Sequence, residues 1–433
     1  MSFPTSPCPL DILIVGAGLG GLGASISARL SSHRVTVFES AKALQEIGAG
    51  LQITPNASRL LSLWQLPASL WESAAEPSTL TVHRYDGSVL SHSPNFSEEI
   101  RARYGGAPFI DLHRVDLQQA LYARAKELGV EFRLGSKVRS VDWQAARPSI
   151  TLETGERVEG DLVIAADGLW SACRSAFVGR ADPPQPTGDL AYRVVLEADV
   201  HLKDDEELYK WVTEPKVHFW AGPGAHAVGY SLRGGKMYNI VLLVPDDLPE
   251  GVSRTVGSVE EMRALFEGWD PILTKFLSKV EGVDKWKLMH RPELPRWVSE
   301  QGNLVFLGDA CHPMLPYLAQ GANSALEDGA VLGLLLGHIK MKEQLPQALN
   351  LYEKLRKARG DAIARETFKQ RHDFHLPDGP EQQARDQIFL SQLGKELKGA
   401  FPSRWQCPEV QPWLYGYEAQ REVEEAIKSH PFV

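Results

Sequence analysis

Three short runs of apolar residues dominate the hydrophobic pattern of the chain. They cover residues 12–15, 162–166 and 304–307, and each leads directly into a turn that contains glycine. Unbroken apolar runs of this length, bounded by turn residues, are typical of strands buried on both faces of a parallel sheet. The three turns are then expected together at the carboxyl edge of that sheet, where open α/β sheets bind ligands.

The pattern changes between about residues 186 and 290, where aromatic and β-branched residues follow one another between glycine-rich turns. This texture predicts a second lobe of antiparallel strands over residues 192–196, 217–220, 226–232 and 237–244. We expect a helix over residues 260–280. From about residue 365 onward, charged residues with scattered proline and tryptophan predict a helix followed by irregular C-terminal wrapping.

Length and charge then narrow the class of protein. With 433 residues, 43% of them hydrophobic and 23% charged, the chain can bury a large core and is expected to form two or three lobes. The excess of acidic over basic residues, 55 against 46, argues against a nucleic-acid partner. Because no uninterrupted apolar run reaches about 18 residues, we expect no membrane span. No targeting signal is readable, so we expect a cytoplasmic protein.

The cysteines suggest neither a metal site nor a disulfide framework. Cys8, Cys173, Cys311 and Cys407 lie far apart along the chain and form no Cys-x-x-Cys pair. We therefore expect reduced thiols and no bound metal.

The first chemical motif follows the first apolar run. Residues 16–21 read Gly-Ala-Gly-Leu-Gly-Gly and fit G-x-G-x-x-G between a strand and a helical stretch. Gly16 would make the tight turn, Ala17 and Gly18 would let the backbone approach a pyrophosphate, and Gly21 would allow close packing of helix on strand. The free N–H groups of the helix N-terminus would face the phosphates. The motif predicts a dinucleotide site.

An acidic residue lies at the position where a dinucleotide-binding motif has a carboxylate for the ribose. A second predicted strand, residues 35–38, ends at Glu39, which lies 18 residues after Gly21. At this distance a carboxylate hydrogen-bonds the adenosine ribose of the dinucleotide. The motif and Glu39 leave NAD and FAD as alternatives.

Two later turns resemble the second and third fingerprints of the single-component (group A) FAD-dependent aromatic hydroxylases. They are Asp-Gly-Leu-Trp-Ser-Ala-Cys-Arg at residues 167–174 and Gly-Asp-Ala-Cys-His-Pro at residues 308–313. The resemblance extends through residues 48–57, 113–117 and 316–328, and is closest to the fungal salicylate hydroxylase-like branch. Three fingerprints in the family's order are far more specific than one glycine motif.

The resemblance implies an α/β fold with a Rossmann-like FAD-binding domain, a β-sheet substrate domain of the para-hydroxybenzoate hydroxylase type and a helical C-terminal segment. It implies FAD as the cofactor and NADH or NADPH as a transient co-substrate. The expected domain boundaries are FAD-binding parts at 1–80, 111–185 and 291–370, substrate-domain parts at 81–110 and 186–290, and a tail at 371–433.

The resemblance also assigns residues to FAD. Asp309 resembles the carboxylate that binds the ribityl or ribose hydroxyls, and Arg114 resembles the arginine along the diphosphate. Asp167 resembles the aspartate of the Asp-Gly motif. Gly321 and Ala322 would begin a helix, to about residue 336, whose N-terminus faces the flavin. Gly50 lies in the matching segment 48–57.

Simpler structural interpretations stand beside several of these assignments. Arg114 could instead pair with Asp111 or Asp116 as a solvated ion pair. Asp309 could be an ordinary turn residue. Ser171 and Arg174 are interpreted as structural residues that stabilise the Asp-Gly turn, and Cys311 as a packing residue. For His312, a catalytic role and a structural role in the loop remain alternatives.

The second lobe holds the candidates for catalysis. His226 and Tyr230 are four residues apart on one predicted strand, so they point to the same face of the sheet. Related hydroxybenzoate hydroxylases place a histidine and a tyrosine at this spacing around the substrate phenol. Arg193 is the candidate cation for an anionic substrate. The alternative is that His226 only follows a turn and Tyr230 only fills the sheet.

The function implied is a monooxygenase that uses NAD(P)H and O₂ to hydroxylate a small phenolic substrate through a flavin C4a-hydroperoxide. A salicylate-type hydroxybenzoate with decarboxylation is favoured, since Pro316 stands where some 3-hydroxybenzoate hydroxylases have a substrate-binding glutamine. Alternatives are oxidation of a larger phenolic secondary metabolite, a plain nicotinamide dehydrogenase and a non-catalytic flavin-binding protein. We expect a monomer or homodimer.

Overall fold

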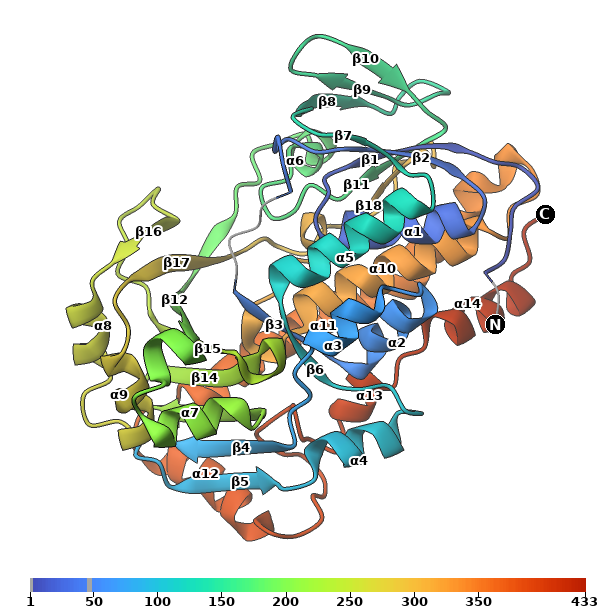
Figure 1. Cartoon of the computed structure of the whole chain (residues 1–433). Helices are drawn as coiled ribbons and strands as arrows, with labels where there is room; N and C mark the ends of the chain where they lie inside the picture. The colour runs from blue at the N-terminus through green and yellow to red at the C-terminus, as the bar shows by residue number, and fades with distance from the viewer. Residues whose placement is uncertain (1–2, 45–48) are drawn as a thin grey trace.

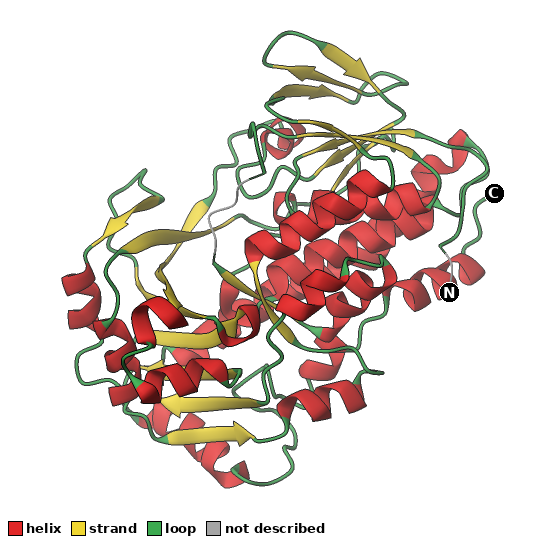
Figure 2. Cartoon of the chain, viewed as in Figure 1, coloured by secondary structure: helices red, strands yellow, loops and turns green. Residues whose placement is uncertain are grey.

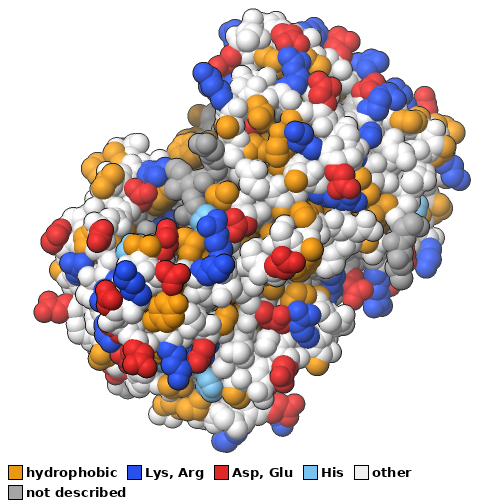
Figure 3. All heavy atoms as spheres, in the orientation of Figure 1, with side chains coloured by type: hydrophobic (Ala, Val, Ile, Leu, Met, Phe, Trp, Pro, Cys, Tyr) orange, Lys and Arg blue, Asp and Glu red, His pale blue; other side chains and the backbone are white. Residues whose placement is uncertain are grey.

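The computed structural model describes residues 3–44 and 49–433, and Gly48 of the segment matched above lies outside this range. The chain forms an upper part built on a parallel sheet and a lower part built on a large, mainly antiparallel sheet, with long helices beside both (Figure 1). No helix in the described ranges is long and apolar enough to cross a membrane. On the face drawn in Figure 3, basic and acidic side chains are intermixed rather than gathered by sign.

The three apolar runs are neighbouring strands of one sheet, as their pattern predicted. The sheet has the order β18-β11-β1-β2-β7, and all its strands are parallel. Its strands are β1 (Asp11–Val15), β2 (Arg34–Phe38), β7 (Glu131–Arg133), β11 (Leu162–Ala165) and β18 (Leu304–Phe306). Every residue of β11 and β18 is buried. Both faces are therefore covered, which explains why polar residues do not interrupt these strands.

Helices cover one face of the parallel sheet, and a small antiparallel sheet lies across the other (Figures 1 and 2). The helices are α1 (Leu19–Leu30), α5 (Arg114–Glu127), α10 (Gln320–Leu336) and α11 (Leu345–Phe374), and the small sheet consists of β8 (Val138–Asp142), β9 (Ser149–Leu152) and β10 (Arg157–Glu159). Glycines bring α1 and α10 together, since a Cβ at Gly333 would lie 2.3 Å from the Cβ of Ser27. The short helix α6 (Ala172–Val178) follows β11.

The second lobe is an eight-stranded sheet of order β16-β17-β12-β15-β14-β13-β4-β5. The four strands predicted from the sequence lie inside β12 (Gln185–Glu197), β13 (Lys216–Gly222), β14 (Ala225–Leu232) and β15 (Met237–Pro245). The edges are supplied by β4 (Thr79–Arg84), β5 (Val89–Ser93), β16 (Arg254–Gly257) and β17 (Val283–His290). The β13–β4 pair is parallel, so a segment from early in the chain completes the sheet.

The single helix expected over residues 260–280 was wrong. The structure has two helices, α8 (Val259–Leu265) and α9 (Pro271–Ser278). Between them Gly268 adopts a φ of +76°, and Asp270 caps α9 by accepting the N–H of Ile272 at 3.1 Å. Proline at the first position of α9 cannot continue a preceding helix, so the chain must break here.

Smaller elements connect the two lobes. They are the two-stranded sheet of β3 (Gly50–Ile53) and β6 (Ile110–His113), and the helices α2 (Pro55–Leu63), α3 (Ala68–Ser73) and α4 (Phe96–Arg103). The helix α7 (Glu206–Thr213) packs within the second lobe. A 3₁₀ turn over Pro316–Leu318 precedes α10.

Most of the C-terminal segment covers one face of the large sheet, whereas its last helix packs against α10. It contains α12 (Pro380–Gln392), α13 (Gln411–Tyr415) and α14 (Ala419–Ser429) after the long helix α11, with irregular chain between them. Phe374, Phe389, Phe401 and Trp405 share a hydrophobic cluster with Phe219 of β13 and Tyr230 of β14. The tail therefore forms a wall of the second lobe, a role that its composition did not reveal.

Candidate active site

The turn between β1 and α1 has the shape that the glycine motif predicts. Gly16 adopts a φ of +103°, and a Cβ on it would lie 2.5 Å from the carbonyl oxygen of Ala166. A Cβ on Gly21 would lie 2.1 Å from the carbonyl oxygen of Gly16, so both positions exclude a side chain. At Gly18, by contrast, a Cβ would meet no atom of the described residues within 4 Å. The backbone here faces open space at the N-terminus of α1.

That open space is a pocket of about 480 Å³ at the carboxyl edge of the parallel sheet. Its lining includes Gly16, Ala17, Gly18, Phe38, Glu39, Asp167 and Gly168. Glu39 accepts the N–H of Ala17 and the N–H of Ala41, each at 2.8 Å, which fixes its carboxylate at the pocket. Its contact with a ribose stays a prediction.

Asp167 offers the pocket an unsatisfied oxygen. One of its carboxylate oxygens accepts the N–H of Cys173 at 3.0 Å, whereas the other is buried without a hydrogen-bond partner among residues 3–44 and 49–433. Buried polar atoms are almost always paired, so an orphaned acceptor beside a cavity indicates that a ligand or water completes it. Ser171 caps α6 by accepting the N–H of Arg174 at 2.8 Å, which supports its structural interpretation.

Asp309, Arg114 and the start of α10 lie at the same edge of the sheet. Asp309 is exposed in the turn after β18, but the surrounding protein raises the pKa of its carboxyl by desolvation, with Arg114 near enough to oppose that effect. Asp116, the alternative partner of Arg114, is held by Arg233 at 2.8 Å. A Cβ on Gly321 would have no atom of the described residues within 4 Å. The first N–H groups of α10 therefore have room for a ligand.

These features fit a flavin dinucleotide. Two helix N-termini, from α1 and α10, have open space in front of them, and acidic side chains stand at the ends of β2, β11 and β18. A dinucleotide needs such donors for its phosphates and such acceptors for its hydroxyl groups. Arg114, Asp167 and Asp309 would hold FAD together with Glu39, and the α10 N-terminus, including Gly321 and Ala322, would face its flavin end.

One face of the large sheet lies against β3 and the turn before α10, since Asn239 accepts the N–H of Gly50 and the ring of His226 packs on Tyr317. Residues paired across strands share a face, which identifies the other members of this face. Arg193 pairs with Val241, which pairs with Val228. On one side of this row Asn239 pairs with Tyr230, and on the other Leu243 pairs with His226. Val228 and Val241 are partly exposed although most of their neighbours on this face are buried. A small apolar surface with a histidine at one end and a tyrosine at the other results.

His226 and Tyr230 are both deeply buried. The ring of His226 lies 5.1 Å from the ring of Tyr317 in the turn before α10, and burial lowers the pKa of His226 well below its ordinary value. Burial raises the pKa of Tyr230, and the nearby Asp111 carboxyl adds to the effect. At neutral pH, His226 is therefore a neutral proton acceptor and Tyr230 a protonated donor.

Comparison with known proteins agrees with this geometry. The FAD binding domain family matches residues 9–367. The chain belongs to this family. It is 51% identical over 421 residues to the FAD-dependent monooxygenase OpS4 of Beauveria bassiana, covering 97% of both chains. It is 31% identical to a 3-hydroxybenzoate 6-hydroxylase of Polaromonas naphthalenivorans, covering 95% of this chain and 97% of that one.

Solved structures give the same fold. A salicylate hydroxylase in complex with substrate superposes with a TM-score of 0.77 at 21% identity, covering 98% of this chain and 99% of that one. The family match and the relatives make this protein an FAD-dependent monooxygenase of the aromatic-ring hydroxylase type. The expected fold class and the FAD cofactor are confirmed.

One residue of the monooxygenase that sequence reasoning did not single out, Asn239, touches the candidate catalytic face beside Gly50, which sequence reasoning assigned to the cofactor site. Asn239 accepts the N–H of Gly50 at 2.9 Å, and its own NH₂ group is buried without a described partner. A Cβ on Gly50 would lie 2.8 Å from the hydroxyl oxygen of Tyr230, so this glycine joins strand β3 closely to the sheet. A lone asparagine in the apolar run 237–244 was the available signal for Asn239.

Arg193 lies on the same face as Tyr230 and His226, with its guanidinium 4.9 Å from the ring centre of Trp286. The ring quadrupole of an indole attracts a cation, so this contact helps to hold the guanidinium on this face of the sheet. The position supports Arg193 as a candidate for binding an anionic group, which remains a prediction.

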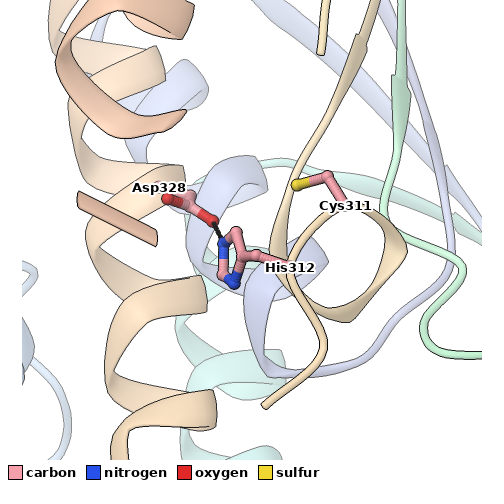
Figure 4. Close-up of side chains that lie close together, drawn as sticks. All are labelled: Cys311, His312 and Asp328. Atoms are coloured by element: carbon pink, nitrogen blue, oxygen red, sulfur yellow. Dashed lines mark hydrogen bonds and ion pairs between the residues drawn. The ribbon is translucent and has the colours of Figure 1, made fainter. Parts of the chain in front are cut away.

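A buried cluster between the turn after β18 and helix α10 has side chains of the kind that bind metals but forms an ion-pair network. His312 donates to Asp328 at 2.6 Å, and Cys311 lies beside them (Figure 4). Asp328 also accepts the N–H of Gly308 at 2.9 Å and the Nε–H of Arg356 at 2.8 Å. Although burial disfavours the charged imidazole, Asp328 raises the pKa of His312. Asp328 thus accepts hydrogen bonds from one backbone N–H and two cationic side chains, which accounts for the cluster as an ion-pair network.

Proposed function

We propose that this monooxygenase uses NADH or NADPH and O₂ to hydroxylate a phenolic ring, with a salicylate-type hydroxybenzoate as the favoured substrate. The observation that carries the proposal is the apolar surface of Val228 and Val241 between a neutral histidine and a protonated tyrosine. A flat aromatic ring matches this surface. The resemblance to hydroxybenzoate hydroxylases supports the same class of substrate.

The chain's own residues would prepare the ring for attack. An electrophilic oxygen attacks a phenolate faster than a phenol, so a base within reach of the hydroxyl accelerates the reaction. His226, held neutral by burial, would accept the phenolic proton, and Tyr230 would donate a hydrogen bond to a second oxygen of the substrate. Bound FAD supplies the activated oxygen once a nicotinamide dinucleotide has reduced it.

Arg193 would bind the carboxylate. It neighbours Val241 in the row of residues that would lie under the ring. An arginine matches the planar geometry of a carboxylate through two parallel hydrogen bonds. If the oxygen is delivered to the carbon that bears this carboxylate, CO₂ leaves and a dihydroxylated ring results.

A larger phenolic metabolite is the second candidate substrate. The fungal relative at 51% identity, which covers almost the whole chain, is named as an FAD-dependent monooxygenase without a benzoate substrate. In that case the ring would still lie on Val228 and Val241, and Arg193 would bind a different acidic or carbonyl group.

The proposal is tested with the purified, FAD-loaded protein. NADH, NADPH and O₂ consumption is measured with salicylate, 3- and 4-hydroxybenzoate and carboxylate-free phenols, while peroxide and CO₂ are quantified. Oxidation stimulated by salicylate, with CO₂ release and little peroxide, is the expected result. Coupled turnover with only the carboxylate-free phenols would favour the second candidate, and a yellow protein inert to every phenol would contradict both.

Replacing the tyrosine should separate substrate chemistry from cofactor binding. Tyr230→Phe is expected to lower kcat/KM for hydroxylation about 10- to 100-fold, because a hydrogen bond to a charged oxygen contributes about 1.5–3 kcal/mol. FAD content should stay unchanged. Tyr238→Phe is the matched control, since Tyr238 is equally buried but belongs to the opposite face of the same sheet. Equal losses in both variants, or loss of flavin, would indicate damage to the fold instead.

A further inference from the structure

His226 is joined to a second histidine from the far end of the chain. Its Nδ1 lies 2.7 Å from Nε2 of His375, the residue that follows α11. Both side chains are largely buried, with 9% of the His375 side chain exposed. A nitrogen–nitrogen hydrogen bond holds one proton, so one of the two imidazoles donates and the other accepts.

A buried carboxylate decides which imidazole donates. Asp189 of β12 lies with one oxygen 3.9 Å from Nδ1 of His375, and only 1% of its side chain is exposed. This distance is too long for a hydrogen bond, but the negative charge of an ionised carboxylate attracts a polar N–H, so Asp189 favours the proton on Nδ1 of His375. Nε2 of His375 then carries a lone pair, and the shared proton belongs to Nδ1 of His226. The remaining nitrogen of His226, Nε2, is therefore the basic one.

The charges around the two histidines keep both imidazoles neutral before substrate binds. Asp189 also accepts hydrogen bonds from the hydroxyl of Tyr317 and from Arg371, whose Nη2 lies at 2.6 Å. Arg371 thus balances the charge of Asp189. Burial lowers the pKa of His375 to about 4, with Asp189 opposing and Arg371 reinforcing the shift. Tyr317 stays protonated because burial and Asp189 raise its pKa.

We propose that His375 and Asp189 are positioning residues that hold His226 with Nε2 as the proton acceptor and share the proton taken from the substrate. This inference rests on the proposed function. The phenolic O–H would lose its proton to Nε2 of His226, and the proton on Nδ1 of His226 would pass to Nε2 of His375. His226 ends neutral, His375 carries one positive charge beside Asp189, and the substrate carries one negative charge. The product takes the proton back by the same route.

The proton positions can be measured without any substrate. In FAD-loaded protein labelled with ¹⁵N-histidine, long-range ¹H–¹⁵N spectra separate protonated from unprotonated ring nitrogens, and His226→Asn identifies the signals. The expected result is a neutral His226 protonated at Nδ1 and a neutral His375 protonated at Nδ1. The reverse tautomer at His226, with the proton on Nε2, would overturn the proposal whatever the substrate proves to be.

The functional arm compares pH profiles with the best substrate of the phenol panel. His375→Phe removes the proton acceptor, and we expect kcat to fall about tenfold or more, with the acid limb of its profile moving to higher pH by about one unit. His375→Gln keeps an acceptor for Nδ1 of His226 but cannot become charged, so it should restore part of kcat and leave the limb displaced. An unchanged pH profile in both variants would contradict the proposal.

His218→Phe controls for the loss of a buried histidine. His218 lies on the adjacent strand β13, on the opposite face, bonded to His83 at 3.0 Å. Its replacement is expected to change Tm without moving the acid limb. If no phenol supports turnover, the proposed function fails, whereas the NMR result still decides the tautomer.

Discussion

Replacing Arg356 by methionine is expected to lower the free energy of unfolding by about 3–5 kcal/mol, because it breaks two fully buried ion pairs at once and leaves Glu327 only Arg359, and Asp328 only His312, as a cationic partner. Arg356 is fully buried, with Nε 2.8 Å from Asp328 and Nη1 in a 2.6 Å ion contact with Glu327. Its guanidinium also lies 5.0 Å from the ring centre of Tyr417. The variant therefore weakens the packing of α11 against α10 and the C-terminal tail. Urea unfolding followed by circular dichroism gives the value.

Arg421→Met is the matched control for this experiment. Arg421 bonds Glu425 at 2.9 Å on the surface of α14, with 72% of its side chain exposed. Exposed pairs contribute about 1 kcal/mol or less, so the control should remain close to the unmodified protein. Similar small effects of Arg356→Met and Arg421→Met would refute the buried network.

Asp309→Ala should weaken FAD binding by about 10- to 100-fold. A hydrogen bond with a charged partner contributes about 1.5–3 kcal/mol, and each 1.4 kcal/mol corresponds to a tenfold change. Asp309 is exposed at the end of β18 and is well placed for a cofactor hydroxyl, whereas Asp328 behind it is committed to the ion-pair network. Quenching of flavin fluorescence during titration of the apoprotein gives the Kd.

Asp309→Asn separates the charge of Asp309 from its ability to accept hydrogen bonds. Asparagine keeps an acceptor oxygen, so its Kd should fall between those of the unmodified protein and Asp309→Ala. Because the side chain is exposed, both variants should keep the Tm of the apoprotein within the range of surface substitutions. Unchanged FAD affinity in Asp309→Ala would remove Asp309 from the cofactor site.

The parallel sheet could be predicted from the sequence because the burial of each strand determines the residue types within that strand. Strands β1, β11 and β18 are covered on both faces, so each is an unbroken apolar run, and the ligand-binding edge needs glycine directly after the strand. The face shared by His226 and Tyr230 followed from the alternation of one strand. The two acidic residues Glu327 and Asp328 in an apolar helix were an unused signal of a buried network.

The partners of these residues could not be predicted in the same way. His375 lies 149 residues after His226, and Asp189 lies on a different strand, so only the folded chain brings them together. Strand β4 likewise joins β13 across more than a hundred residues. Such contacts leave no periodic trace in the sequence, because periodicity reports the burial of one element and not the identity of its neighbour.

The wall formed by the tail also determines when this chain can finish folding during synthesis. Phe401, Trp405 and Tyr415 belong to the same cluster as Phe219 of β13, although the ribosome produces them almost two hundred residues later. Until then, residues of α4 and α11 cover the apolar face of the sheet only in part, and the remainder is open to association with other nascent chains. A chain terminated before residue 400 therefore lacks part of a core rather than a dispensable end.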